Sequence, residues 1–92
     1  MNYTILFHPE AAKDISRIAG SMKDRLKVAI RERLMTEPAI YGKPLRSTLK
    51  GYWKLRVGDY RIVFGIKAGE VAIYAVCHRR EVYNIVNNRL DS

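Results

Sequence analysis

The chain has 92 residues, 48% of them hydrophobic, which is enough for one small domain with a core and argues against intrinsic disorder. Its 17 Lys and Arg residues exceed its 9 Asp and Glu residues, giving a net charge of +8. No apolar run is as long as a membrane span, and residues 1–7 are typical of a strand rather than of a signal peptide. We therefore expect one domain over residues 1–92, located in the cytoplasm and not bound to a membrane.

The positive charge is concentrated in one part of the chain. Residues 42–67 contain seven Lys or Arg residues and a single acidic residue, Asp59, so this segment carries +6 of the total +8. A protein that is merely basic would spread its charge more evenly. A localised basic surface instead indicates a polyanionic partner, with nucleic acid as the first candidate.

The N-terminal part predicts a strand followed by two helices. Residues 2–7 alternate with the period of a strand, and His8 then precedes Pro9, which suits the first position of a helix. His8 is expected at or beside the N-cap of that helix, and Gly20 at its C-terminal end. Ser21 is expected to cap a second helix, so that the two helices form a hairpin packed on the sheet.

A loop is predicted after the second helix. Pro38 marks the end of that helix, and residues 37–51 contain several Pro and Gly residues, which are typical of irregular structure. Leu45 and Leu49 are expected to attach the loop to the core. The loop would then lead from the helices into the next strand.

Residues 52–66 predict two antiparallel strands joined by a tight turn. Apolar and polar residues alternate on both sides of Gly58-Asp59, a glycine-first pair suited to a type II′ turn. This turn would place Arg56 directly opposite Arg61, on one side of the sheet. The side chains on that side would be Lys54, Arg56 and Arg61, and those on the other side Trp53, Leu55, Ile62 and Phe64.

The predicted pairing of Arg56 with Arg61 needs an explanation, because like charges directly opposite each other destabilise a strand pair. An anionic ligand on that side of the sheet is the simplest one. The alternative is a solvated polar face, as on most sheets that are buried on one side only. The residue spacing is compatible with both.

The last third of the chain predicts a central strand and a short helix. Residues 71–76 are almost wholly apolar, as in a strand covered on both faces, and residues 81–90 have helical spacing. Cys77 is expected to be a small core residue rather than a nucleophile. The whole chain thus predicts an α+β fold of the order βααβββα, with an N-terminal strand, a helical hairpin, a three-stranded antiparallel meander in the same sheet and a short C-terminal helix.

A second group of chemically capable side chains follows the last predicted strand: His78, Arg79, Arg80 and Tyr83. If that strand pairs with residues 60–66, its end approaches the cations of the hairpin. Arg binds phosphate oxygens, His or Lys can move a proton and Tyr can stack on a base, a set that suits phosphodiester chemistry. The sequence contains no metal-site, phosphate-loop or serine-hydrolase motif, so we expect neither a metal nor a cofactor.

Two strings of the sequence resemble the RelE/ParE toxin superfamily, on its RelE side. They are Leu49-Lys-Gly-Tyr-Trp-Lys-Leu-Arg-Val-Gly-Asp-Tyr-Arg-Ile-Val-Phe64 and His78-Arg-Arg-Glu-Val-Tyr83. The order of the predicted elements, the length and the charge also match, so the resemblance covers essentially the whole chain.

This resemblance implies a toxin of a type II toxin–antitoxin system that cleaves translated mRNA in the ribosomal A site. The 2′-hydroxyl of the RNA would attack the adjacent phosphate without a metal ion. The implied partners are the ribosome with its mRNA, a RelB-like antitoxin that neutralises the toxin, and operator DNA through the toxin–antitoxin complex.

The family motif also implies roles for individual residues. Lys54 would activate the 2′-hydroxyl or stabilise its charge, Arg61 would stabilise the pentacovalent phosphate, and Tyr83 would orient the substrate or stack on it. Arg79, with Arg80 as the alternative, matches the arginine that assists the leaving 5′-oxygen. Because arginine side chains in proteins keep their charge, charge stabilisation is favoured over proton donation. The residues expected to bind RNA are Lys50, Arg56, His78 and Arg80.

One position departs from the family pattern. Tyr52 stands where the best-known member has a second lysine, two residues before the position of Lys54, so Lys50 or His78 would have to compensate. Two other functions stay open at this point. One is a ParE-like toxin, which shares the fold but poisons DNA gyrase, and the other is a basic module that binds nucleic acid without catalysis.

Overall fold

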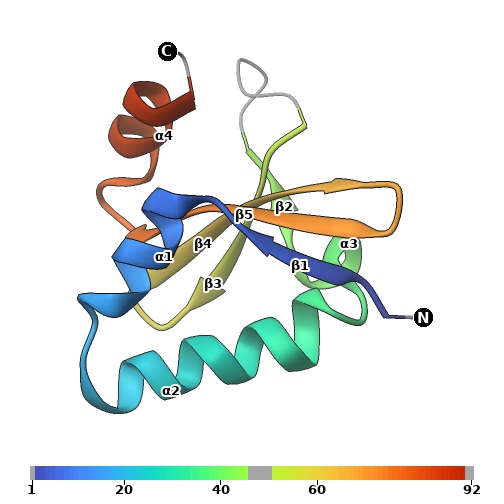
Figure 1. Cartoon of the computed structure of the whole chain (residues 1–92). Coiled ribbons are helices and arrows are strands. Elements are labelled where there is room, and N and C mark those ends of the chain that lie inside the picture. The colour runs from blue at the N-terminus through green and yellow to red at the C-terminus, as the bar shows by residue number, and fades with distance from the viewer. Residues whose placement is uncertain (1, 46–50, 91–92) are drawn as a thin grey trace.

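The computed structural model describes residues 2–45 and 51–90, which form a five-stranded sheet with flanking helices (Figure 1). The strands are β1 (Thr4–Phe7), β2 (Lys43–Pro44), β3 (Trp53–Val57), β4 (Tyr60–Lys67) and β5 (Glu70–His78). The helices are α1 (Pro9–Ser16), α2 (Gly20–Ala29), which a π-helical segment (Ile30–Leu34) continues, α3 (Pro38–Tyr41) and α4 (Val82–Leu90). None of these helices is long and apolar enough to cross a membrane.

The strands follow the order β1-β5-β4-β3-β2 in the sheet. β1 runs parallel to β5, and the other neighbouring pairs are antiparallel. The predicted α+β class and the meander β3–β4–β5 are confirmed, and the apolar strand β5 lies between β1 and β4 as a central strand. Helices α1 and α2 follow β1 at one edge of the sheet and lead the chain towards β2 at the other edge.

The predicted hairpin register is confirmed residue by residue. Arg56 pairs with Arg61, and Leu55 pairs with Ile62. Gly58 has a φ of 59°, the positive value that the first turn residue of a type II′ hairpin requires. The turn chemistry therefore fixes which side chains point to which face of the sheet.

The two faces of the sheet have different partners. One face packs on α1 and α2 and forms the larger core, whose fully buried members include Leu26, Leu34, Ile62, Phe64 and Ile73. The other face, here called the cationic face, carries Lys54, Arg56, Arg61, Val63 and Cys77. Helix α4 packs on the cationic face through Val82 and Val86, and it contacts β5 and β4 there.

The predicted connection between the first two helices is wrong in detail. His8 is the N-cap of α1 as predicted, and its Nδ1 accepts a hydrogen bond from the backbone N–H of Glu10 at 3.1 Å. However, α1 ends at Ser16, and Gly20 begins α2 with a φ of 68°. The N-cap of α2 is a residue without a capping side chain, so Ser21 does not have the predicted role. The positive φ is a conformation that glycine adopts readily on either side of a helix.

The predicted loop after the second helix contains regular structure. Pro38 begins the short helix α3, and β2 adds an edge strand beside β3. Leu45 is buried as predicted, and its backbone N–H donates to the carbonyl of Tyr52 at 2.9 Å. Leu49 lies outside the described residues. Because β2 is antiparallel to β3, the chain after α3 is held along the edge of the hairpin.

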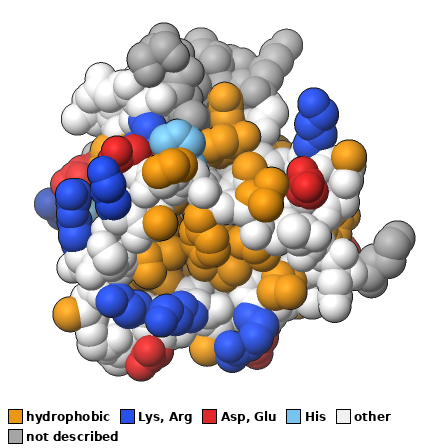
Figure 2. Space-filling view, viewed as in Figure 1, with side chains coloured by type: hydrophobic (Ala, Val, Ile, Leu, Met, Phe, Trp, Pro, Cys, Tyr) orange, Lys and Arg blue, Asp and Glu red, His pale blue; other side chains and the backbone are white. Residues whose placement is uncertain are grey.

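Apolar side chains also remain on the surface. Figure 2 shows them gathered in the area that α1, β1 and α2 enclose. Exposed hydrophobic side chains on these elements include Phe7 of β1, at 46% exposure, and Val28 of α2, at 40%. Contiguous exposed apolar surface of this kind often marks a site that binds another protein.

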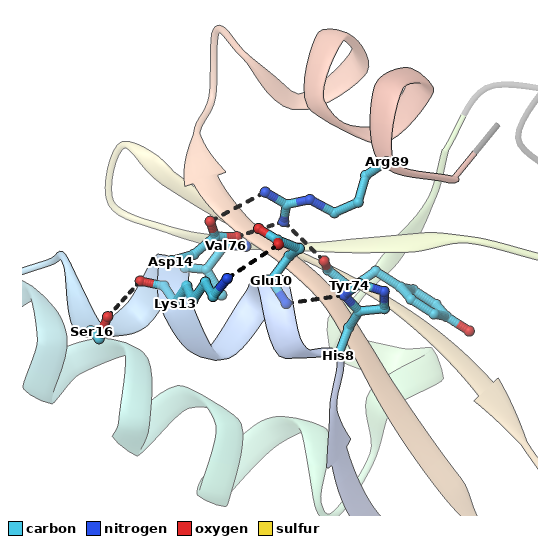
Figure 3. Close-up of polar contacts among 8 residues, drawn as sticks. All are labelled: His8, Glu10, Lys13, Asp14, Ser16, Tyr74, Val76 and Arg89. Atoms are coloured by element: carbon cyan, nitrogen blue, oxygen red, sulfur yellow. Dashed lines mark hydrogen bonds and ion pairs between the residues drawn. The ribbon is translucent and has the colours of Figure 1, made fainter. Parts of the chain in front are cut away.

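One largely buried carboxylate ties α1, β5 and α4 together (Figure 3). Asp14 Oδ2 accepts hydrogen bonds from the backbone N–H of Val76 at 2.9 Å and from Arg89 Nη1 at 2.7 Å. Asp14 Oδ1 accepts from Arg89 Nη2 at 3.3 Å, and Arg89 Nη1 also donates to the carbonyl of Tyr74 at 3.1 Å. β1 ends opposite Ile73, so these contacts cover backbone groups of β5 beyond the end of β1.

We predict that Asp14→Asn lowers the free energy of unfolding by about 2 kcal/mol, because Arg89 loses its charge partner in a largely buried setting. Urea denaturation of this variant, of Arg89→Met and of the double variant gives the coupling energy between the two side chains. A coupling energy below about 0.5 kcal/mol would show that the pair does not anchor α4. Lys13→Gln is the matched control, since its contact with Glu10 is exposed and should be worth less than about 0.5 kcal/mol.

Candidate functional site

The hairpin and the neighbouring edge strand gather cations on the cationic face. Arg56 of β3 lies opposite Arg61 of β4, and Lys54 lies two residues before Arg56 on the same face. Lys43 of β2 lies opposite Lys54, so a second like-charge pair adjoins the first. Two such pairs side by side destabilise the free sheet, and a bound anion would relieve the repulsion.

The hairpin turn orients the guanidinium of Arg61. Its Nη1 donates hydrogen bonds to the backbone carbonyls of Gly58 at 3.0 Å and Tyr60 at 2.9 Å. Among the described residues, the Nη2 and Nε groups of Arg61 have no hydrogen-bond partner. The guanidinium is therefore fixed in place before any ligand binds, with donors left for an anion.

The segment after β5 completes a pocket on this face. Arg61 pairs with Cys77 near the end of β5. The backbone N–H of Arg79 donates to the carbonyl of Asp59 at 2.8 Å, and Arg79 Nε lies 3.9 Å from Asp59 Oδ1, which keeps this segment beside the hairpin turn. The resulting pocket of about 430 Å³ is lined by Lys54, Arg61, Arg79, Arg80, Val82 and Tyr83. The structure thus brings together all four residues that the sequence placed at the reaction centre.

The residues that the sequence assigned to RNA binding lie in different parts of the structure. Arg80 lines the same pocket as Arg61. Arg56 lines an adjoining pocket of about 250 Å³ that shares Lys54 and Arg61 with the first. Lys50 lies outside the described residues.

His78 lies away from both pockets. It pairs with Tyr60, and the centroids of the two rings are 6.1 Å apart on the face opposite to Arg61. Its Nδ1 accepts a hydrogen bond from the backbone N–H of Arg80 at 3.3 Å. This placement gives His78 a local structural contact on the face opposite to that of Lys54.

Tyr52 itself contributes to packing. Its ring meets that of Tyr74 edge to face, with centroids 5.4 Å apart, and it packs against the cluster formed by Val63, Val82 and Val86. The position of the family lysine is therefore occupied here by a side chain that supports α4.

Two residues of the cationic face were missed by reasoning from the sequence. Tyr41 and Lys43 line the pocket of about 250 Å³ together with Lys54, Arg56 and Arg61. Lys43 belongs to the basic segment, but the two-residue strand β2 has no period that could place it. Its neighbour Pro44, a residue confined to edge strands within sheets, is the one local signal that could have indicated this strand.

Cys77 is a core residue, as predicted, and is 5% exposed beneath α4. Burial, together with the negative charges of Asp14 and Glu81, raises the pKa of its thiol from 9.0 to about 11. The thiol therefore stays protonated at neutral pH, where a thiolate would be needed for nucleophilic attack. Within residues 2–45 and 51–90, no group of three or more His, Cys, Asp or Glu side chains is placed to hold a metal ion.

A family model described as the ParE toxin of the type II toxin–antitoxin system parDE matches residues 5–83 of the chain. The chain belongs to the RelE/ParE toxin family. It is 31% identical to Toxin RelE of Mycobacterium tuberculosis, over 90% of this chain and 78% of that relative. It is 34% identical to Toxin RelG of the same organism, over 90% of this chain and 98% of that relative. The resemblance carried by the two sequence strings is thereby confirmed.

Solved structures show the same fold. The toxin–antitoxin complex RelBE2 of Mycobacterium tuberculosis matches with a TM-score of 0.79 at 31% identity, over 86% of this chain and all of that chain. A mutant of the toxin RelE from E. coli in the free state matches with a TM-score of 0.80 at 20% identity, over 99% of this chain and 97% of that chain. The type II toxin described here therefore shares both its sheet and its helix arrangement with these structures.

The raised pKa of the Cys77 thiol predicts a specific pH dependence of the toxin's stability. In the unfolded chain the thiol ionises near 9.0, whereas in the folded toxin it stays protonated up to about 11. Its contribution to stability is thus complete below pH 9.0 and is lost as the pH rises to about 11, by roughly 2–3 kcal/mol. Urea denaturation across this pH range should show a fall that is larger by this amount in the wild type than in Cys77→Ala, since the ionisation of Tyr and Lys is common to both. Parallel curves for the two proteins would contradict the burial of the thiol.

Proposed function

We propose that this toxin is an endoribonuclease that cleaves translated mRNA on the ribosome by metal-free attack of a 2′-hydroxyl. The observation that carries the proposal is the pocket in which Lys54, Arg61, Arg79 and Tyr83 meet. Cations suit the phosphate of RNA, and a tyrosine suits its base. The names of the relatives, Toxin RelE and Toxin RelG, support the RelE side of the family.

The reaction transfers one proton at each end of the phosphate. The 2′-hydroxyl loses its proton to a water molecule and its oxygen bonds to phosphorus, while the bond from phosphorus to the 5′-oxygen breaks and that oxygen takes up a proton from a water molecule. The products are a 2′,3′-cyclic phosphate and a 5′-hydroxyl. Lys54 stabilises the negative charge that develops on the attacking 2′-oxygen. Arg61 binds the non-bridging oxygens through Nη2 and Nε, and Arg79 stabilises the charge on the leaving 5′-oxygen. Catalysis then rests on positioning and on cations aimed at the developing negative charge.

Arg79 is preferred over Arg80 for the leaving oxygen because its backbone is anchored. The hydrogen bond from the Arg79 N–H to the carbonyl of Asp59 fixes its distance from the hairpin turn. The contact between Arg79 Nε and Asp59 Oδ1 is long and exposed, so it leaves the guanidinium able to move to a phosphate. Arg80, which is also exposed and lines the pocket, would hold the RNA chain.

A cognate antitoxin would neutralise the toxin. The solved relatives RelBE2 of Mycobacterium tuberculosis and RelB–RelE of Methanococcus jannaschii are complexes of a toxin with an antitoxin. Two features of this chain suit such a partner: the net charge of +8 and the apolar surface enclosed by α1, β1 and α2 (Figure 2). An acidic chain with an apolar helix or strand would match both. Binding to operator DNA would then occur through the complex.

The test is primer-extension mapping of mRNA after brief induction of the toxin. Wild-type toxin should create new 5′ ends inside translated reading frames, and Lys54→Ala and Arg61→Ala should each reduce cleavage by roughly 10²- to 10³-fold through loss of charge stabilisation. Lys67→Ala is the matched control, since this lysine is exposed on the same strand as Arg61 and lies outside the pocket.

The possible outcomes of this experiment distinguish the three functions that are still open. A fully active Arg61→Ala variant would refute the assigned chemistry. Growth arrest with DNA damage and intact mRNA would favour a gyrase poison, the activity of the ParE side of the family. No growth arrest at all would favour a non-catalytic module, whose RNA binding should weaken steeply with salt.

A further inference from the structure

The cationic face extends beyond the reaction pocket. The adjoining pocket of about 250 Å³ is lined by Tyr41, Lys43, Lys54, Arg56 and Arg61, so it shares two residues with the reaction pocket. Cleavage of one phosphodiester bond uses one phosphate. An RNA strand that lies across Lys54 and Arg61 places a neighbouring nucleotide on one side of them, and the second pocket offers groups for that nucleotide.

Lys43 supplies a cation for a second phosphate. It lies directly opposite Lys54 across β2 and β3, and neighbouring strands are about 4.8 Å apart. Partners of this kind share a face of the sheet. The amines of Lys43 and Lys54 can therefore reach toward successive phosphates of one strand, whereas a compact ligand with a single phosphate would need only one of them.

Tyr41 supplies a platform for a base. It is the last residue of α3 and is 49% exposed. The guanidinium carbon of Arg33, in the π-helical segment, lies 5.6 Å from the centroid of the ring. This cation–π contact restrains the ring while part of it stays open to the pocket. Aromatic rings beside cations are the typical elements of sites for single-stranded nucleic acid.

The turn that joins these two residues is held against the core. A Cβ atom on Gly42 would lie 2.5 Å from the ring of Phe64 and 2.9 Å from the carbonyl of Pro38, so only glycine fits there. Phe64 is fully buried, and the backbone N–H of Gly42 donates to the same carbonyl of Pro38 at 2.9 Å. Tyr41 and Lys43 therefore flank a fixed point of the fold, and little ordering is needed when a ligand binds.

We propose that Tyr41 and Lys43 form a subsite for the nucleotide next to the scissile phosphate of single-stranded RNA. Tyr41 stacks on its base, and Lys43 binds its phosphate. This inference rests on the proposed cleavage function and extends the substrate from one phosphodiester bond to a strand of at least two. Every base has a face that can stack on an aromatic ring. The subsite therefore sets the register in which the strand binds and discriminates little between the four bases.

A fluorescent RNA strand tests the subsite directly. The probe is a hexanucleotide with 2′-O-methyl riboses, which cannot be cleaved, carrying the adenine analogue 2-aminopurine at one position at a time. Stacking on Tyr41 should quench the fluorescence at one position when wild-type toxin binds. Tyr41→Phe should keep this quenching, Tyr41→Ala should lose it, and Lys43→Gln should weaken binding of the probe roughly tenfold. Lys67→Gln is the matched control, and thermal unfolding confirms that each variant is folded.

The mRNA mapping described above separates failure of this subsite from failure of the cleavage function. If wild-type toxin creates no new 5′ ends, the cleavage function fails whatever the probe shows. If wild type cleaves mRNA but no probe position is quenched, or Tyr41→Ala retains the quenching, the subsite is overturned. Cleavage by wild type together with quenching that depends on Tyr41 supports both.

Discussion

The side chain of Asp14 is the contact on which the arrangement of the site depends. β1 is only four residues long, so the later residues of β5 have no strand beside them on that edge. There the carboxylate of Asp14 accepts a hydrogen bond from the backbone N–H of Val76, and the guanidinium of Arg89 donates one to the carbonyl of Tyr74. These side chains take the place of the backbone of a neighbouring strand. The same ion pair joins α1 to the end of α4, which lies on the other face of the sheet (Figure 3). The backbone groups of β5 that the short strand β1 leaves without a neighbour are thus hydrogen-bonded by side chains of α1 and α4.

This closure has a consequence at the opposite end of α4. With its C-terminal end held by Asp14 and its middle packed through Val86, the helix presents Val82 and Tyr83 at the wall of the reaction pocket. The like-charge pairs of the cationic face lower the stability of the free toxin, and the large core on the other face offsets them. The apolar burial on one face of the sheet therefore stabilises the fold enough to tolerate electrostatic repulsion on the other face.

The features predictable from the sequence were those encoded locally. The register of the hairpin followed from Gly58-Asp59 and the period of the flanking residues, and the two family strings contained the residues that line one pocket. Contacts between distant segments were not predictable, and the clearest case is Asp14 with Arg89, 75 residues apart. Gly20 was misassigned because a positive φ suits either end of a helix. His78 was grouped with Arg79 by adjacency, although alternation along β5 sends its ring to the other face.

The short strand β2 was the most consequential omission, because it changes how the departure at Tyr52 is understood. In this chain Tyr52, which has a phenol in place of an amine, packs against Tyr74 and supports α4. Lys43 lies opposite Lys54 and lines a pocket with it, which places a second amine beside the first from the neighbouring strand. Lys54 thus has a second cation beside it through strand pairing and not along β3.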